Sequence, residues 1–121
     1  MVLVDTSVWI AHFREGHPGL TDLLLNGNVS SHSFVIGELA CGNLKDRKQI
    51  LSLLKEIPRV IPVAEEEIIS FIETHQLAGK GLGLVDVHLL ASALLSNVEL
   101  WTLDKILLTA AQKLNIAYKN H

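Results

Sequence analysis

The chain has 121 residues, of which 49% are hydrophobic and 19% are charged, so it can bury a core of its own and is not a disordered tail. Its one cysteine, Cys41, can form neither an internal disulfide nor a four-cysteine zinc module, and a reducing cytoplasm is therefore the expected compartment. Ten basic and 13 acidic residues give a formal net charge of −3, which argues against a general nucleic-acid binder.

The first half of the chain predicts two short strands and three helices. Short apolar runs indicate strands, and apolar residues spaced three and four apart indicate helices. We expect Thr6 or Ser7 to cap the first helix and Ser33 to cap the third, which Gly42 ends. The expected elements are, in order, a buried strand at 2–4, helices at about 7–15 and 20–24, a brief strand near 29 and a helix at about 33–41.

The second half of the chain repeats this alternation. Asp46 is expected to open a fourth helix, which Pro58 ends. The acidic run at 65–67 suits the first turn of a helix, where the helix dipole favours negative charge. The elements expected after Pro58 are a strand at 60–63, a helix from 65, a helix at about 85–96, a strand at 99–102, a helix at about 105–114 and an edge strand near 116–118.

Strands that alternate with helices at these spacings predict an α/β fold. We expect a three-layer α/β/α sandwich with a central parallel sheet of about five strands, in which ligands bind beyond the carboxyl ends of the strands. No break in composition divides the chain, so residues 1–121 are expected to form a single domain. An acid as early as Asp5 argues against a signal peptide, and no uncharged stretch reaches the roughly 20 residues of a membrane span.

Four acidic residues lie within apolar sequence rather than on an evidently solvated face. Asp5 and Asp104 each come just past the end of a predicted buried strand, so their carboxylates converge if those strands are neighbours. Glu38 lies in the middle of an apolar helix, and Asp86 lies at the start of another. Each acid alone is explained as a helix cap or an ion-pair partner. Four half-buried carboxylates together would repel one another unless a cation compensated them, and oxygen ligands favour Mg²⁺ or Mn²⁺.

The order and spacing of four segments resemble the PIN-domain family and, in size and arrangement, its VapC-type toxins. The segments are VLVDTSVWI at 2–10, VIGEL at 35–39, LVDVHLLA at 84–91 and LWTLD at 100–104. The resemblance covers almost the whole chain. It implies a parallel sheet of about five strands with helices on both sides. It also implies a ribonuclease that depends on Mg²⁺ or Mn²⁺, forms a homodimer and is silenced by a cognate antitoxin protein.

The resemblance also assigns residues. The family's acidic quartet, which would hold metal and carry catalysis, matches Asp5, Glu38, Asp86 and Asp104, and the hydroxyl positions that line the same pocket match Thr6, Ser7 and Thr102. No further acid follows Asp104 in the last helix, where some members carry one, which leaves one or two metal ions open. If two ions bind, one positions the attacking water and the other the leaving 3′ oxygen, so 5′-phosphate and 3′-hydroxyl ends are expected.

The charge of the chain is compatible with RNA once these four acids are set aside, because 9 acidic and 10 basic residues remain. The densest basic cluster is Lys45, Arg47 and Lys48, which suits phosphate contact and a solvated helix start about equally. Lys80 and Lys105 are comparable candidates. Six scattered histidines, the last of them His121, have no zinc-binding spacing, and Cys41, one turn after Glu38, is expected in the core.

Three other functions are alternatives to a metal-dependent nuclease. A noncatalytic PIN-like module that binds RNA or protein would have little reason to keep four costly acids. A signalling receiver domain would need a second acid beside Asp5 and a phosphorylatable aspartate after the strand at 60–63, where Thr6 and Ala64 stand. A phosphatase of the haloacid-dehalogenase type would need an aspartate two residues after Asp5, where Ser7 stands.

Overall fold

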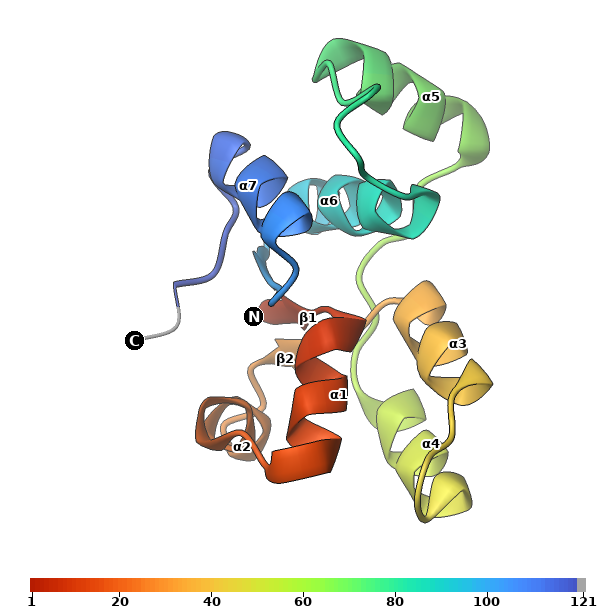
Figure 1. Ribbon diagram of the computed structural model, residues 1–121, viewed down its shortest axis with the longest axis vertical. Coiled ribbons are helices and arrows are strands. Elements are labelled where there is room, and N and C mark those ends of the chain that lie inside the picture. The colour runs from red at the N-terminus through yellow and green to blue at the C-terminus, as the bar shows by residue number, and fades with distance from the viewer. Residues whose placement is uncertain (120–121) are drawn as a thin grey trace.

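The computed structural model describes residues 1–119, so His121 lies outside the described residues. The elements are, in chain order, β1 (Val2–Val4), α1 (Thr6–Glu15), α2 (Pro18–Leu25), β2 (Val29–Ser30), α3 (Ser33–Cys41), α4 (Arg47–Glu56), α5 (Glu65–Thr74), α6 (Leu84–Ser96), β3 (Glu99–Trp101) and α7 (Lys105–Lys113) (Figure 1). The helices therefore lie close to where the apolar spacing predicts them. Within residues 1–119, no helix has the length and apolar character to cross a membrane.

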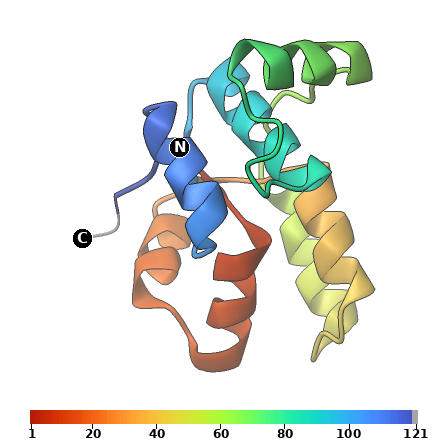
Figure 2. The same ribbon diagram turned by 45° about the horizontal axis from the view of Figure 1, so that its top comes forward.

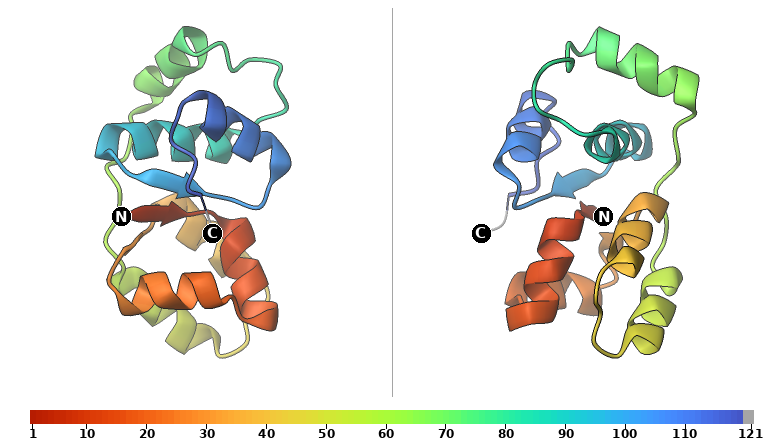
Figure 3. Two further views of the ribbon diagram at one scale, coloured as in Figure 1. Left: turned by 90° about the vertical axis from the view of Figure 1, so that its left-hand side faces the viewer. Right: turned by 45° about the vertical axis from the view of Figure 1, so that its right-hand side comes forward.

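The three strands form one parallel sheet in the order β2-β1-β3. Leu3 of β1 pairs with Ser30 on one side and with Leu100 on the other. Figure 3 shows the sheet between α6 and α7 on one face and the helices of the first half of the chain on the other, with α5 packed outside α6. The expected parallel α/β arrangement is confirmed.

The expectation of about five strands is wrong, because the structure forms three within the described residues. The two missing strands are reduced to single bridges at the two edges of the sheet. Arg59 bridges Ser31 beside β2, and Ala117 bridges Leu100 beside β3. Both bridges are parallel, so the chain runs where the five-strand expectation places it but pairs over one residue each time.

Two prolines limit the bridge at Arg59. Ser31 N–H donates to the Pro58 carbonyl, and Val60 N–H donates to the Ser31 carbonyl, at 2.8 Å each. Extending this parallel ladder by one step in either direction needs the N–H of residue 58 or of residue 62, and both are prolines, which have none. The chain beyond the bridge turns to α6 instead, where Ile61 N–H donates to Ser96 Oγ at 2.8 Å.

The bridge at Ala117 is short because a helix ends just before it. Ile116 N–H still donates to the Ala111 carbonyl of α7, at 3.0 Å, so the chain is free to pair only from Ile116 onward. On the other side of the bridge, Val98 N–H is used by the Ala93 carbonyl of α6, at 3.0 Å. Helix-terminal hydrogen bonds therefore occupy the backbone that a longer edge strand would need.

Two of the expected helix caps are also wrong. The residue in the N-cap position of α1 is Asp5, and Thr6 and Ser7 lie inside the helix, where their hydroxyls bond to other groups. The cap of α3 is His32 rather than Ser33, because His32 Nδ1 accepts a hydrogen bond from Phe34 N–H at 2.9 Å. A histidine ring nitrogen can accept like the oxygen of a serine, but cap statistics do not favour it.

The core of the molecule is built around the sheet. All residues of β1 are buried, as are Leu100 and Trp101 of β3, and they pack against apolar side chains of the helices on both faces. Buried strands of this kind are rigid, so the residues that directly follow them are held in fixed positions. The carboxyl ends of β1 and β3 are therefore the part of the fold that can position polar side chains accurately.

Replacing Leu100 with alanine is expected to destabilise the fold by about 2 to 5 kcal/mol, because the side chain is fully buried and its removal leaves a cavity. Replacing Leu25, which is 80% exposed at the end of α2, is the matched control and should change stability by less than about 0.5 kcal/mol. Urea denaturation measures both free energies of unfolding. Equal effects of the two substitutions would contradict the burial described.

Candidate active site

Asp5 is the buried centre of the polar cluster at the carboxyl ends of β1 and β3. Its backbone N–H donates to the Trp101 carbonyl at 2.9 Å, which continues the pairing of β1 with β3 and sets Asp5 beside Thr102. Its side-chain Oδ2 accepts from Ser7 Oγ and from Thr102 Oγ1, at 2.8 Å each. Hydrogen bonds to an ionised carboxylate are stronger than neutral ones, and here they fix the carboxylate of a side chain that is only 7% exposed.

The same two hydroxyls also shape the segment that leads to Asp104. Ser7 Oγ accepts from Leu103 N–H at 3.0 Å, and Thr102 Oγ1 accepts from Asp104 N–H at 3.0 Å. Each hydroxyl therefore donates to Asp5 and accepts from the backbone after β3. This arrangement confirms the expectation that Asp5 and Asp104 lie at the ends of neighbouring strands.

Asp104 is exposed and begins α7. Its Oδ1 accepts from Ile106 N–H at 3.1 Å, so it is the N-cap of that helix. This is the ordinary capping role that explains an aspartate in this position without any metal. The other oxygen of the carboxyl group remains available, since a cap uses only one.

Glu38 reaches the cluster from α3, where Thr6 Oγ1 donates to its Oε1 at 2.7 Å. It is exposed, as Asp104 is, so the expectation that all four acids are half-buried is wrong for these two. Glu38 and Cys41 share the solvent-facing stripe of α3 with Phe34 and Gly37, at spacings of three and four residues. Cys41 is likewise exposed, so the expectation that it lies in the core is wrong.

Asp86 is half-buried in the first turn of α6, and its Oδ2 accepts from Gly83 N–H at 2.9 Å. Burial raises the pKa of Asp86, and the negative charges of Asp5, Asp104 and Glu38 raise it further. The hydrogen bond from Gly83 lowers this pKa without cancelling the rise. All three charges that act on Asp86 are thus carboxylates, which links the four acids electrostatically.

The four acids share one pattern of use. Each engages one carboxylate oxygen in the hydrogen bonds described, and within residues 1–119 the second oxygen of each has no hydrogen-bond partner. The structure does not, however, draw them into one tight cage. Over the described part of the chain, no group of three or more acidic, histidine or cysteine residues lies close enough together to hold a metal ion.

The donor set nevertheless fits a hard divalent cation. Mg²⁺ keeps several of its waters and is usually held through one or two carboxylates, so it does not need three side chains within direct reach. The unpaired carboxylate oxygens are the ligand type that Mg²⁺ and Mn²⁺ prefer. Asp5 and its neighbours would hold such an ion, and repulsion among the carboxylates would fall when it binds.

Three residues near this cluster were not singled out from the sequence as a group. The rings of His32, Phe34 and His88 pack together where α3 meets α6, with centroids 4.8 to 6.1 Å apart, and His88 meets the other two rings edge-on. Burial lowers the pKa of His32 and of His88, and the nearby His88 lowers the pKa of His32 further. Both rings are therefore favoured in their neutral form, which packs rather than adding charge to the site. No spacing rule relates His88 to residues more than fifty positions earlier, so the sequence held no signal for its contact with His32 and Phe34.

Gly83 was also missed, although a signal for it existed. Its backbone N–H holds the Asp86 carboxylate, and the two residues are three apart at the start of a helix. An N-cap residue followed by an acidic side chain in the third helical position is one half of a capping box. A capping box is usually recognised by serine or threonine at the N-cap, and glycine has no side-chain oxygen, so the sequence did not show the usual pattern.

The chain matches the PIN domain over residues 2–113 and therefore belongs to the PIN domain family. It is 41% identical over 118 residues to Ribonuclease VapC32 of Mycobacterium tuberculosis, from strains CDC 1551 / Oshkosh and ATCC 25618 / H37Rv. The matched region covers 97% of this chain and 95% of the relative. It is 29% identical over 107 residues to Ribonuclease VapC1 of Methanocaldococcus jannaschii, which covers 86% of this chain and 76% of the relative. Within the family these similarities place the chain among the VapC-type proteins, as the sequence motifs indicated.

Replacing Asp86 with asparagine is expected to stabilise the metal-free protein at neutral pH. Asparagine keeps an oxygen for Gly83 N–H but removes the charge that the other carboxylates repel. Because the folded-state pKa of Asp86 is raised, wild-type stability falls as the pH rises from the ordinary carboxyl pKa through the folded one. The gain should therefore be present at pH 7 and disappear below about pH 4, where the carboxyl group is protonated in both states.

Thermal unfolding in EDTA across this pH range measures the effect. Replacing Glu73, an exposed acid of α5, with glutamine is the matched control and should leave the unfolding temperature unchanged. A variant at Asp86 that unfolds at the wild-type temperature at pH 7 would show that the carboxylates do not repel one another as described.

Proposed function

We propose that the chain is a metal-dependent endoribonuclease that hydrolyses RNA phosphodiester bonds with Mg²⁺ or Mn²⁺, as the toxin of a type II toxin-antitoxin pair. Its membership of the PIN domain family supports this proposal, as do the names of its relatives, which are VapC ribonucleases. The observation that carries it is the set of four carboxylates from the end of β1, from α3, from α6 and from the β3–α7 connection. Among residues 1–119, one oxygen of each carboxylate has no hydrogen-bond partner.

The chain's own residues would divide the work of the site. Ser7 and Thr102 hold Asp5 with one oxygen directed to their hydroxyls, which fixes the orientation of the other. Thr6 holds Glu38 in the same way. A bound Mg²⁺ or Mn²⁺ would neutralise phosphate charge, lower the pKa of a water molecule and stabilise charge that develops in the transition state. Water would attack phosphorus and the 3′ oxygen would leave, so the products carry 5′-phosphate and 3′-hydroxyl ends.

The relatives' names also bear on partners. VapC denotes the toxin of a pair, so we propose a cognate antitoxin protein as the inhibitor of this chain. We further propose a homodimer in the cytoplasm, as the family resemblance and the single cysteine lead us to expect. One or two metal ions per site both remain compatible with four acids.

A noncatalytic PIN-like module that binds RNA or protein is the second candidate. Two features of the described residues favour it: Asp104 acts as a helix cap, and no three acids lie close enough to hold a metal ion directly. In that case the carboxylates would serve only as caps and as acceptors for hydroxyls. Measurements of cleavage and of metal binding separate this candidate from the nuclease.

Purified protein is expected to cut a mixed cellular RNA pool into discrete products with Mg²⁺ or Mn²⁺ and to leave it intact in EDTA. Replacing Asp5 with asparagine should lower cleavage at least about 100-fold, because the oxygen that accepts from Ser7 and Thr102 is kept while the charge is lost. Gel analysis of the RNA and mapping of the product ends measure both outcomes.

The Asp5 variant also controls for a contaminating nuclease. Cleavage that persists in this variant would come from another protein or another site. Products that end in a 2′,3′-cyclic phosphate would contradict attack by water, since they form when the 2′-hydroxyl is the nucleophile.

Mn²⁺ is expected to raise the unfolding temperature of the wild-type protein. A ligand at 100 times its Kd stabilises the folded state by about 2.7 kcal/mol, which corresponds to a shift on the order of 10 °C in a domain of this size. Replacing Asp5 with asparagine should abolish most of the shift, and replacing exposed Glu73 with glutamine should not. No shift in the wild type would favour the noncatalytic module.

A further inference from the structure

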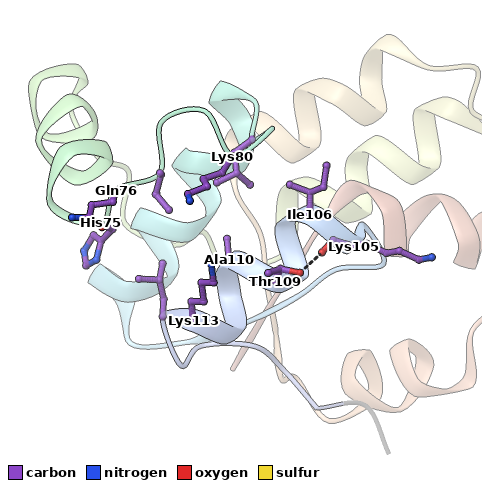
Figure 4. A pocket seen from close by; sticks show the side chains of 11 residues that line it. His75, Gln76, Lys80, Lys105, Ile106, Thr109, Ala110 and Lys113 are labelled. Atoms are coloured by element: carbon purple, nitrogen blue, oxygen red, sulfur yellow. Dashed lines mark hydrogen bonds between the residues drawn. The ribbon is translucent and has the colours of Figure 1, made fainter.

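A groove of about 420 Å³ lies beside the acid cluster and was not expected from the sequence. Its walls are the end of α5, the glycine-rich segment at 79–83 and the outer face of α7 (Figure 4). Residues 79–83 join α5 to α6, and α7 follows β3, so the groove brings together segments distant in the sequence. Figure 2 shows the segment between α5 and α6 lying beside α7.

Of the residues that the structure describes, three lysines line the groove, Lys80, Lys105 and Lys113, and no acid does. Lys105, Thr109 and Lys113 are spaced four residues apart and so form one stripe along α7, about 12 Å long at 1.5 Å per residue. In Figure 4, Lys80 and Lys113 lie to either side of Ala110, while Lys105 extends from the other end of the helix. Positive charge is therefore found beside Ala110 and at the other end of α7, where Lys105 points away from Lys80 and Lys113.

Beneath this charge the groove has an apolar floor. Leu77, Leu82, Ile106 and Ala110 line it, and of these Leu77 and Ala110 are buried. A positive rim over an apolar floor suits a ligand that is anionic along one side and has flat or apolar groups along the other. A single strand of nucleic acid has this chemistry, with phosphates on one side and sugars and bases on the other.

Both walls of the groove lead to the acid cluster. Gly81 packs close to α7, because a side-chain carbon built on it would lie 3.3 Å from Ile106 Cδ1, and its φ of +81° favours glycine. This segment ends at Gly83, whose N–H holds Asp86. On the other wall, Lys105 directly follows Asp104. A strand in the groove would therefore have one end beside two of the four acids.

The basic cluster of Lys45, Arg47 and Lys48, which the sequence made a comparable candidate for phosphate contact, is less suitable for binding RNA at the acids. Arg47 donates to the carbonyls of Ala40 and Gly42, so it closes the end of α3 rather than reaching solvent anions. Lys45 and Lys48 belong to the connection between α3 and α4 and the start of α4, which Figures 1 and 2 both show away from α7. Charge complementarity next to the acids thus favours the groove.

We propose that the groove of Lys80, Lys105 and Lys113 binds the ribose-phosphate backbone of single-stranded RNA on one side of the bond to be cut. The proposal rests on the proposed ribonuclease function. The lysines offset the repulsion between the acid cluster and the phosphates, and the apolar floor accepts sugars or bases without selecting their sequence. They position the RNA and take no part in the chemical step.

Binding of a fluorescein-labelled, mixed-sequence single-stranded RNA of 20 nucleotides, followed by anisotropy, tests this proposal. The parent is the Asp5→Asn protein, which does not cut the probe. Adding Lys80→Gln, Lys105→Gln and Lys113→Gln should weaken binding roughly tenfold or more and reduce the slope of log Kd against log salt by about 2, since each single-strand phosphate contact contributes about 0.7. The matched control changes Lys45, Lys48 and Lys55 to glutamine, which removes the same charge from exposed positions elsewhere.

Three outcomes would overturn the proposal, and they are distinguishable. Equal loss of affinity in both triple variants would show that only net charge matters. Parent-like binding by the groove variant would reject the groove while leaving the nuclease intact. Failure of the parent to bind RNA, together with a wild type that does not cut it, would reject the ribonuclease function and the groove with it.

A parallel measurement tests another class of partner. Labelled polyglutamate stands for an acidic polypeptide. If the groove variant loses polyglutamate binding and keeps RNA binding, the groove is a protein-binding surface and the proposal is wrong. All lysines concerned are exposed, so thermal unfolding of each variant should match its parent and confirm that the fold is unaffected.

Discussion

Two hydroxyl groups that donate to one buried carboxylate hold the polar end of this fold together. Asp5 accepts from Ser7 of α1 and from Thr102, which directly follows β3. Both hydroxyls also accept from the backbone that leads to Asp104. These four hydrogen bonds join the first part of the chain to the last. Asp104 and Glu38 are tied to this network, because Thr102 Oγ1 accepts from Asp104 N–H and Thr6, which lies between Asp5 and Ser7, donates to Glu38.

The site combines favourable local contacts with unfavourable electrostatics. Each carboxylate contributes to the fold through a cap or a hydroxyl contact, yet burial and its neighbours raise the pKa of Asp86. Conflict of this kind costs stability, and proteins retain it mainly where function requires it. The arrangement therefore has a structural explanation for one oxygen of each acid and none for the other, which is where a cation would act.

The helices and the strand-end positions of two acids could be predicted from the sequence, because both depend on local rules. The convergence of Asp5 and Asp104 followed from two buried strands that end together, and the helices followed from apolar spacing. The exposure of Glu38 could not be predicted, since an apolar helix shows no clear solvent face until its neighbours are placed. The groove beside α7 was equally hidden, because more than twenty residues separate Lys80 from the two lysines of α7. The strand expected at 60–63 did not form, because Pro58 and Pro62 lack the N–H groups that a longer ladder with β2 needs.

Those prolines have a consequence for how the molecule avoids unwanted association. An open parallel sheet offers unpaired backbone groups at its edge, onto which a strand from another chain can be added. Here the edge beside β2 is covered by a segment that Pro58 and Pro62 keep from pairing beyond Arg59, and the N–H of Ile61, which faces away from β2, already donates to Ser96 Oγ. A foreign strand would find no regular ladder to extend on that side. The small sheet is thus shielded from open-ended growth, and another protein approaching this edge must be recognised through side chains.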